Sequence, residues 1–159
     1  MKISILAVGK IKEPFYRDAV REYEKRLSRY AALEITEVAD EPASENLSAA
    51  QIRQVTEKEG IRLLAKEKPG AYRIALCIDG KRMDSVAFSQ HLGEKIDGGI
   101  GRIEFLIGGS NGLSEEAVKS ADLKLSFSDM TFPHQLMRVI LLEQIYRAFK
   151  IRCREPYHK

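Results

Sequence analysis

Short apolar runs alternate along the chain with longer stretches in which apolar residues recur every three or four positions. The short runs predict five strands, at residues 3–8, 33–38, 72–78, 103–107 and 123–127. The longer stretches predict helices over residues 14–29, from 48 to just before 69, from 84 or 85, from 114, and from 133 to about 151. Strands that alternate with helices indicate an α/β fold, with a mostly parallel sheet and helices on both faces.

Local signals support several of these boundaries. Pro14 and Pro133 each suit the first turn of a helix, and Ser48 can cap the helix that follows it. Asp79 and Gly80 are turn residues, so we expect the third strand to close there.

The last predicted helix is apolar on more than one face. Its stripe comprises Leu136, Met137, Ile140, Leu141, Ile145, Ala148 and Phe149, and Val139 and Leu142 widen it. Such a helix is buried by more than its own sheet, either deep in the core or against a partner subunit. We favour the second explanation and predict a homodimer.

Length and composition narrow the class of protein. The 159 residues predict a single domain spanning 1–159, and 44% hydrophobic with 31% charged residues is typical of a soluble globular protein. The apolar stretch at the N-terminus is too short to cross a bilayer, so we expect a cytoplasmic protein without membrane contact. The two cysteines have no metal-ligand or disulfide spacing, and we expect Cys77 to be a small buried hydrophobe and no metal to be bound.

The net charge of +3 is unevenly distributed. Residues 1–30 carry +4 and residues 143–159 carry +3, whereas the middle of the chain carries −4. If the fold brings the two ends together, they form a basic face suited to a phosphate backbone. Two solvated helix faces would explain the same distribution.

A glycine-rich segment, "IGGSNG" at residues 107–112, follows the fourth predicted strand. Its spacing and position differ from those of a dinucleotide fingerprint, which follows the first strand, and no Lys-Ser/Thr pair follows its last glycine as in a P-loop. The segment remains a candidate ligand loop at the carboxyl end of a central strand, or simply a tight turn.

A second loop, "SFSDMTFPH" at residues 126–134, combines small polar residues with Met130 and Phe132. Backbone polar groups beside apolar walls suit a flat, uncharged heterocycle, and together with the glycine loop they could form one pocket. Packing of Met130 and Phe132 beneath the last helix is the alternative. His134 lies beside the predicted pocket, where it could bind ligand or cap structure, whereas we expect His91 to be a surface residue.

The chain ends in Tyr157, His158 and Lys159, which combine an aromatic ring, a proton acceptor and a cation. A frayed terminus is the alternative for any last three residues.

These motifs carry a resemblance. "IGGSNG", the segment from residue 126 to 151, the terminal "PYHK" and "ILAVGKIK" near the start resemble the RlmH (YbeA-like) family of ribosomal RNA methyltransferases, over essentially the whole chain. The family belongs to the SPOUT class, which implies a C-terminal trefoil knot. It also implies a homodimer that uses S-adenosylmethionine to methylate N3 of a pseudouridine in 23S ribosomal RNA on the assembled ribosome.

The resemblance implies site residues as well. The cofactor pocket would comprise Leu76, Gly108, Gly109, Phe127, Ser128, Asp129, Met130, Thr131 and Phe132. The tail would lie at the active site. One departure is that the family commonly has glycine where this chain has Arg154.

For the reaction we expect His158 to act as general base, Lys159 or Arg138 to stabilise developing charge, and Tyr157 to stack on the target base. Basic residues of the other subunit would contact RNA, among them Lys10, Lys12, Arg17 and Arg21. A dimeric RNA-binding protein without chemistry, or a methyltransferase acting on a tRNA base, are the alternatives.

Overall fold

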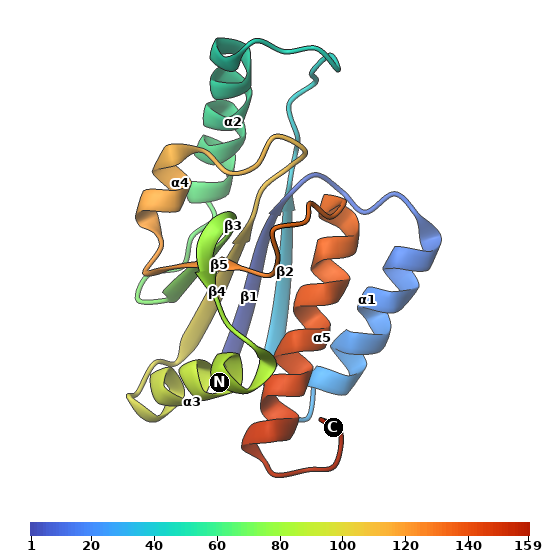
Figure 1. Ribbon diagram of the computed structural model, residues 1–159, viewed down its shortest axis with the longest axis vertical. Coiled ribbons are helices and arrows are strands. Elements are labelled where there is room, and N and C mark those ends of the chain that lie inside the picture. Colours follow the sequence, from blue (N-terminus) through green and yellow to red (C-terminus); the bar gives the residue numbers. More distant parts are fainter.

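Five parallel strands form one sheet in the order β2-β1-β4-β3-β5 in the computed structural model, which describes residues 1–159 (Figure 1). The strands are β1 (Lys2–Val8), β2 (Ala32–Val38), β3 (Tyr72–Arg82), β4 (Arg102–Ile107) and β5 (Leu123–Ser126). The helices are α1 (Pro14–Leu27), α2 (Ala49–Leu64), α3 (Ser85–Asp97), α4 (Glu115–Ser120) and α5 (His134–Arg152). The predicted α/β class and the parallel sheet are confirmed.

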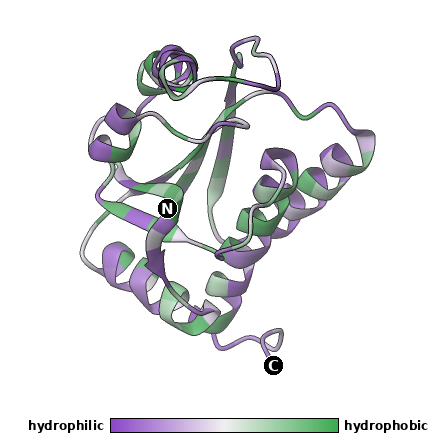
Figure 2. Cartoon of the chain, turned by 45° about the horizontal axis from the view of Figure 1, so that its top comes forward, coloured by the Kyte–Doolittle hydropathy of each residue, from purple (hydrophilic) through white to green (hydrophobic).

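Helices cover both faces of the sheet. Helices α1, α3 and α5 pack on the face to which Ile5 and Phe105 point, whereas α2 and α4 cover the face of Leu6 and Leu106. Strands β1 and β4 are buried on both sides, and each ends in a continuous apolar run, Ile5–Val8 and Phe105–Ile107. The helices, in contrast, carry hydrophilic and hydrophobic residues together, as the colours of Figure 2 show.

Side-chain caps fix three helix starts. Ser48 accepts a hydrogen bond from the backbone of Gln51, whose side chain in turn accepts from the backbone of Ser48, which makes a capping box. Asp84 and Ser114 cap α3 and α4 in the same way through one hydrogen bond each. These polar residues precede apolar periodic segments, so the sequence alone could place the boundaries.

Strand β3 differs from its prediction. It does not close at Asp79-Gly80 but continues to Arg82, and its register with β5 shifts between Leu76 and Lys81. The intervening residues bulge out of the ladder, and Leu125 of β5 pairs with both flanks of the bulge. Turn residues therefore mark an interruption of this strand and not its end.

Helix α5 lies between α1 and α3, and it contacts both (Figure 1). Leu141, Leu142 and Ile145 are wholly buried, and every residue from 134 to 151 is at least half-buried. This central place accounts for much of the wide apolar stripe within one subunit. It also brings the two basic ends of the chain side by side, because α1 and α5 belong to them.

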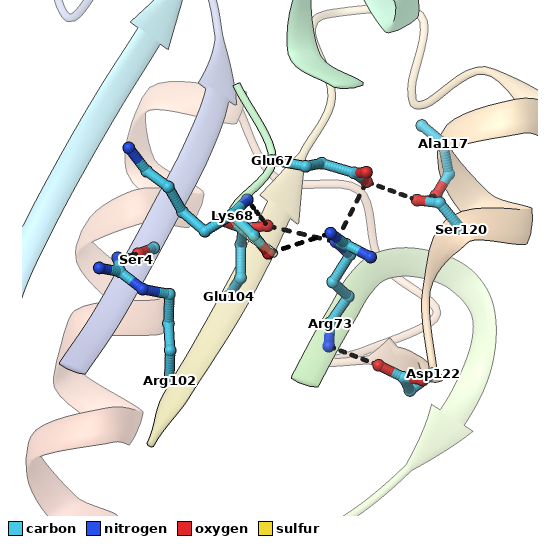
Figure 3. A network of polar contacts seen from close by, with 9 residues as sticks. All are labelled: Ser4, Glu67, Lys68, Arg73, Arg102, Glu104, Ala117, Ser120 and Asp122. Atoms are coloured by element: carbon cyan, nitrogen blue, oxygen red, sulfur yellow. Dashed lines mark hydrogen bonds and ion pairs between the residues drawn. The ribbon is translucent and has the colours of Figure 1, made fainter. Parts of the chain in front are cut away.

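A polar network connects strands and α4 on the face of the sheet that α2 and α4 cover (Figure 3). The Arg73 Nε atom of β3 lies 3.3 Å from a carboxylate oxygen of Glu67 and 3.3 Å from one of Glu104. Ser120, in α4, donates a hydrogen bond of 2.8 Å to Glu67. Since Glu104 is wholly buried in β4, Arg73 compensates a charge that the core would otherwise disfavour.

Two expectations remain to be compared with the fold. His91 is not a free surface residue: it is half-buried, and its Nε2 atom lies 3.0 Å from the Tyr72 hydroxyl, within hydrogen-bond distance. Helical periodicity reports only on residues a few positions apart, so it could not reveal this contact with the distant Tyr72. The trefoil knot that the resemblance implies stays a prediction.

Candidate functional site

A cavity of about 590 Å³ opens at the carboxyl ends of β3, β4 and β5, beside the start of α5. Ligands of open α/β sheets bind at this edge, and the volume lies within the range of small-molecule sites, about 300–1,000 Å³. The sequence places four segments around it: the end of β3, the glycine loop, the loop after β5 and the first turn of α5. No Lys, Arg, Asp or Glu side chain lines the cavity.

The glycine loop owes its glycines to close packing against its own chain. A Cβ on Gly108 would lie 2.4 Å from the carbonyl carbon of Gly112, and Gly112 itself has φ of 84°. The Gly112 N–H donates to the Gly109 carbonyl at 3.0 Å, which closes the turn. A Cβ on Gly109 would lie 3.2 Å from the buried Glu59 carboxylate. Larger residues would therefore open the loop that forms one wall of the cavity.

The loop after β5 forms the opposite wall. Ser128 fixes its shape, because the Ser128 hydroxyl accepts a hydrogen bond of 3.0 Å from the Met130 N–H and the Ser128 carbonyl accepts one of 3.2 Å from Ser126. Phe127 and Phe132 are half-buried, whereas Met130 is 74% exposed at the cavity. Met130 therefore does not pack beneath α5, and it remains available to a ligand.

The cavity gathers most of the predicted cofactor residues. Eight line it: Leu76, Gly108, Gly109, Phe127, Ser128, Met130, Thr131 and Phe132. Asp129 does not; it is an exposed residue that forms an ion pair with Arg82. The loop that carries Asp129 turns its neighbours, and not this carboxylate, toward the cavity.

The bulge of β3 contributes residues that the sequence analysis did not assign to a site. Cys77 and Ile78 line the cavity, and Ile78 is 56% exposed although it continues an apolar run. Cys77 packs against the core beneath α2 but is only half-buried and borders the cavity, so its expected burial is partial. Burial raises the pKa of its thiol, and Asp79 adds to this, so the group remains a protonated, weakly polar wall. The sequence signal that could have identified this part of the site is the apolar Ile78 directly before the turn residues Asp79 and Gly80.

His134 and Met137, in the first turn of α5, complete the lining. Burial lowers the pKa of His134, and the positive charge of Arg138 lowers it further, so this imidazole is neutral at pH 7. A neutral imidazole offers one donor and one acceptor to a ligand. His134 thus belongs to the cavity, as one of its two predicted roles required.

Arg138 lies one turn further along α5 but does not line this cavity. Its guanidinium is 1% exposed and binds Glu37 at 2.5 Å and the carbonyls of Val8 and Gly9 at 3.0 and 2.5 Å. It therefore holds the end of β1 against β2 and α5 through its two Nη atoms, while its buried Nε atom has no partner in the subunit. This geometry gives Arg138 a structural role, and its expected stabilisation of charge at a substrate stays a prediction.

The tail lies along the C-terminal half of α5 (Figure 1). The tail folds back along α5: Tyr157 contacts Glu143 and His158 contacts Arg147, which lie about 14 and 20 Å of helix rise from His134. The tail is not frayed: the Tyr157 hydroxyl donates to Glu143 at 2.7 Å, and its ring meets Tyr146 edge-on at 5.0 Å between centroids. Within one subunit, the predicted catalytic residues and the cavity are not brought together.

Two structural findings bear on the remaining expectations. No group of three or more His, Cys, Asp or Glu residues is arranged to hold a metal ion. None of the five helices combines the length and apolar character needed to cross a membrane.

Comparisons with known proteins agree with this architecture. Ribosomal RNA large subunit methyltransferase H of Carboxydothermus hydrogenoformans is 55% identical to this chain over 159 residues, which are the full length of both. Among solved structures, tRNA (m1G37) methyltransferase of Aquifex aeolicus has a TM-score of 0.53 and 12% identity, with 92% of this chain and 70% of that one covered. A Legionella pneumophila methyltransferase structure with bound SAM has a TM-score of 0.51 and 12% identity, covering 94% and 66%.

The two solved structures are likenesses of fold alone, and this chain spans about two thirds of their length. The family match covers nearly the whole chain: residues 1–158 match the family described as predicted SPOUT methyltransferases. With a full-length relative at 55% identity beside it, the chain belongs to the SPOUT methyltransferase family.

Proposed function

We propose that the protein transfers a methyl group from S-adenosylmethionine to N3 of a pseudouridine in 23S ribosomal RNA, acting as a cytoplasmic homodimer on the assembled ribosome. The observation that carries the proposal is the cavity at the carboxyl ends of the strands, with apolar and backbone walls and no Lys or Arg side chain. The full-length relative named as a ribosomal RNA methyltransferase supports the choice of RNA.

The cavity residues fit this cofactor. S-adenosylmethionine carries no phosphate, so a lining without Lys or Arg suits it better than a nucleotide phosphate. Leu76, Ile107 and Leu125 offer apolar surface to a flat adenine, while the glycine loop and the loop after β5 offer backbone donors and acceptors. When bound, the cofactor supplies a methyl group on a sulfonium, which is already an activated electrophile.

The chain's contribution is therefore mainly alignment and electrostatics. The two loops would hold the cofactor on a rigid sheet edge, and Met130 and Ile78, both exposed at the cavity, would shield the transfer from water. Tyr157 and Lys159 would act on the target base, the first by stacking and the second by its charge.

A homodimer explains how tail and cavity can cooperate. A twofold axis makes an isologous interface, and antiparallel pairing of α5 with its copy sets the C-terminal end of one helix beside the N-terminal end of the other. The tail of one subunit would then reach the cavity of its partner. Supporting residues on α5 are Met137, Ile140 and Gln144, which are only half-buried in the single subunit.

The turn between β1 and α1 is the best-placed surface for RNA. The Lys12 N–H donates to Gln135 at 3.0 Å, so this turn lies against the start of α5 and hence beside the cavity. Lys10, Lys12 and Arg17 form no ion pair, and Phe15 is 62% exposed among them. In contrast, most cations at the other basic end are paired with carboxylates. Free cations around an exposed ring suit a phosphate backbone with an unstacked base.

Incubation with radiolabelled S-adenosylmethionine and assembled ribosomes, free large subunits or tRNA tests the proposal. We expect label in 23S RNA of assembled ribosomes, and nuclease digestion followed by mass spectrometry should place the methyl group on pseudouridine. A thermal-shift measurement with the cofactor is the companion experiment. Absence of both a shift and transfer would leave a non-catalytic RNA-binding protein, and label in tRNA alone would assign a different substrate.

A further inference from the structure

The tail is held by a hydrogen-bonded chain that begins on α5. Glu143 and Arg147 lie one helical turn apart and form an ion pair, in which Arg147 Nε and Nη2 approach Glu143 Oε1 at 2.8 and 2.7 Å. The other carboxylate oxygen accepts two phenol hydrogen bonds, from Tyr23 of α1 at 2.8 Å and from Tyr157 of the tail at 2.7 Å. Both oxygens of Glu143 are thus occupied, and all four contacting atoms of its three partners are donors.

The protonation of this cluster is well defined. Burial raises the pKa of Tyr23, and the Glu143 hydrogen bond and charge raise it further; the pKa of Tyr157 rises for the same reasons. Both phenols therefore stay protonated and remain donors to Glu143 throughout the physiological pH range. The Arg147 guanidinium also lies over the Tyr157 ring, 4.6 Å from its centroid.

The chain ends on His158. The Arg147 Nη1 atom lies 3.3 Å from His158 Nδ1. A guanidinium has only donors, so Nδ1 must be the acceptor of this contact, and it carries no proton. A neutral imidazole has one N–H, so the proton resides on Nε2. The contact thus selects one tautomer of His158 and turns an N–H donor, not a basic lone pair, away from Arg147.

We propose that Glu143 and Arg147 are positioning residues that hold His158 as the Nε2–H tautomer, and that His158 donates a hydrogen bond to a carbonyl oxygen of the target base. This rests on the proposed function and replaces the expected role of His158 as general base. The base N3 is flanked by two carbonyls, so charge that develops at N3 spreads onto their oxygens. A donor placed on one of them stabilises that charge.

The proton balance follows from the same geometry. The bond from the methyl carbon to N3 forms as the bond from that carbon to sulfur breaks, and the sulfur retains the electron pair and becomes neutral. The N3 proton leaves to water. His158 keeps its own proton throughout, and the other charged or titratable groups around it are Arg147, Glu143, Tyr157 and Lys159, with Tyr23 and Arg26 on α1.

Substitution of His158 distinguishes a hydrogen-bond donor from a general base. The amide nitrogen of Gln can occupy the position of Nε2 and donate, but it cannot take up a proton. We expect His158→Gln to keep kcat within about tenfold of wild type, with an unchanged pH profile, and His158→Ala to lose about 10²–10³-fold. Equal inactivity of His158→Gln and His158→Ala would overturn the proposal and restore the general base.

The positioning residues are tested by Glu143→Gln and Arg147→Lys, which keep size but weaken the ion pair. We expect kcat to fall about tenfold with little change in KM for ribosomes. Nitrogen-15 NMR of the dimer should show the Nε2–H tautomer of His158 in wild type and a tautomer mixture in Arg147→Lys. Arg152→Gln, which breaks the separate ion pair with Asp97, is the matched control and should leave both readouts unchanged.

Wild-type kinetics and the spectrum of Arg147→Lys distinguish failure of the proposed function from failure of the positioning role. If wild type transfers no methyl group, the proposed function fails, whereas the NMR result still reports on the tautomer. If Arg147→Lys shows wild-type kcat and the wild-type tautomer, the positioning role is refuted, whatever the substrate.

Discussion

At the scale of single residues, the chain carries strain at Arg154. It is the only residue other than glycine with a positive φ, at 55°. It follows α5, and the hydrogen bonds from Arg154 N to Ile151 O and from Glu155 N to Lys150 O form a Schellman motif. Glycine is favoured at this position, which explains why the resembled family commonly has it there. The tail keeps its path here because arginine adopts the left-handed conformation at an energetic cost.

Arg154→Gly should therefore stabilise the protein by about 1 kcal/mol, since glycine adopts a positive φ without the Cβ clash. Urea unfolding followed by circular dichroism measures the change in the free energy of unfolding. Lys66→Gly is the control, because this exposed residue has no positive φ and the substitution should destabilise by about 0.5–1 kcal/mol. No gain in Arg154→Gly would show that the tail does not hold this conformation in solution.

Glu104 provides a second residue-scale prediction, which concerns pH. Burial raises its pKa above the ordinary 4.5, while the Lys68 N–H and Arg73 oppose the rise. An acid whose pKa is raised by folding adds stability below its unfolded pKa and loses that contribution as pH rises through the folded value. Relative to Glu104→Gln, the wild type should thus lose stability as pH rises from about 4.5 toward neutrality.

Thermal unfolding of both proteins across that pH range measures the difference. Glu115→Gln is the control, because this residue is exposed at the start of α4. A stability difference between wild type and Glu104→Gln that is flat with pH would contradict a raised pKa.

At the scale of elements, the bulge of β3 shapes the site. Gly80 lies in this bulge, and a Cβ there would lie 2.7 Å from the carbonyl carbon of Leu125 in β5. The neighbouring strand thus passes directly against the bulge, which turns Cys77 and Ile78 toward the cavity. The same geometry makes the bulge intolerant of any side chain at Gly80.

Gly80→Ala should push β5 away, destabilise the protein by about 1–3 kcal/mol and weaken cofactor binding. Isothermal titration calorimetry and urea unfolding give the two quantities. Gly101→Ala is matched in chemistry, because a Cβ at Gly101 meets no atom within 4 Å and its φ is not positive. Equal behaviour of the two alanine variants would mean that the bulge yields without disturbing β5.

At the scale of the whole molecule, the separation of tail and cavity makes a dimer experiment decisive. Cys77→Trp fills the cavity, and removal of Tyr157–Lys159 removes the tail but should leave cofactor affinity nearly intact. Each homodimer should be inactive. A heterodimer of the two, purified through different tags, should recover about half of wild-type activity, since one of its two sites combines an intact cavity with an intact tail.

The matched control is a heterodimer in which both defects reside in one subunit and the other is wild type. There each site lacks one component, and no activity is expected if tails act across the interface. If each tail serves its own cavity, these two results are reversed: the first heterodimer is inactive and the second retains about half.

Much of the fold follows from local sequence. Apolar runs predicted all five strands, and Ser48, Asp84 and Ser114 lie where polar caps precede periodic segments, because capping depends on residues a few positions apart. Eight of nine proposed cofactor residues line one cavity, since loops after neighbouring parallel strands meet at the same sheet edge. Asp129 does not line it, because its side chain pairs with Arg82 from another strand, and local sequence could not reveal this ion pair.

The sequence by itself thus determined the elements, their parallel arrangement and the loops that carry chemistry. Only the tertiary structure decided the strand order, the burial of Arg138 against Glu37, and the distance between tail and cavity. It also decided that Arg147 reaches His158 and so selects its tautomer. The physical reason is range: caps and periodicity act within a few residues, whereas burial, ion pairing and proton position depend on groups that folding brings together from distant segments.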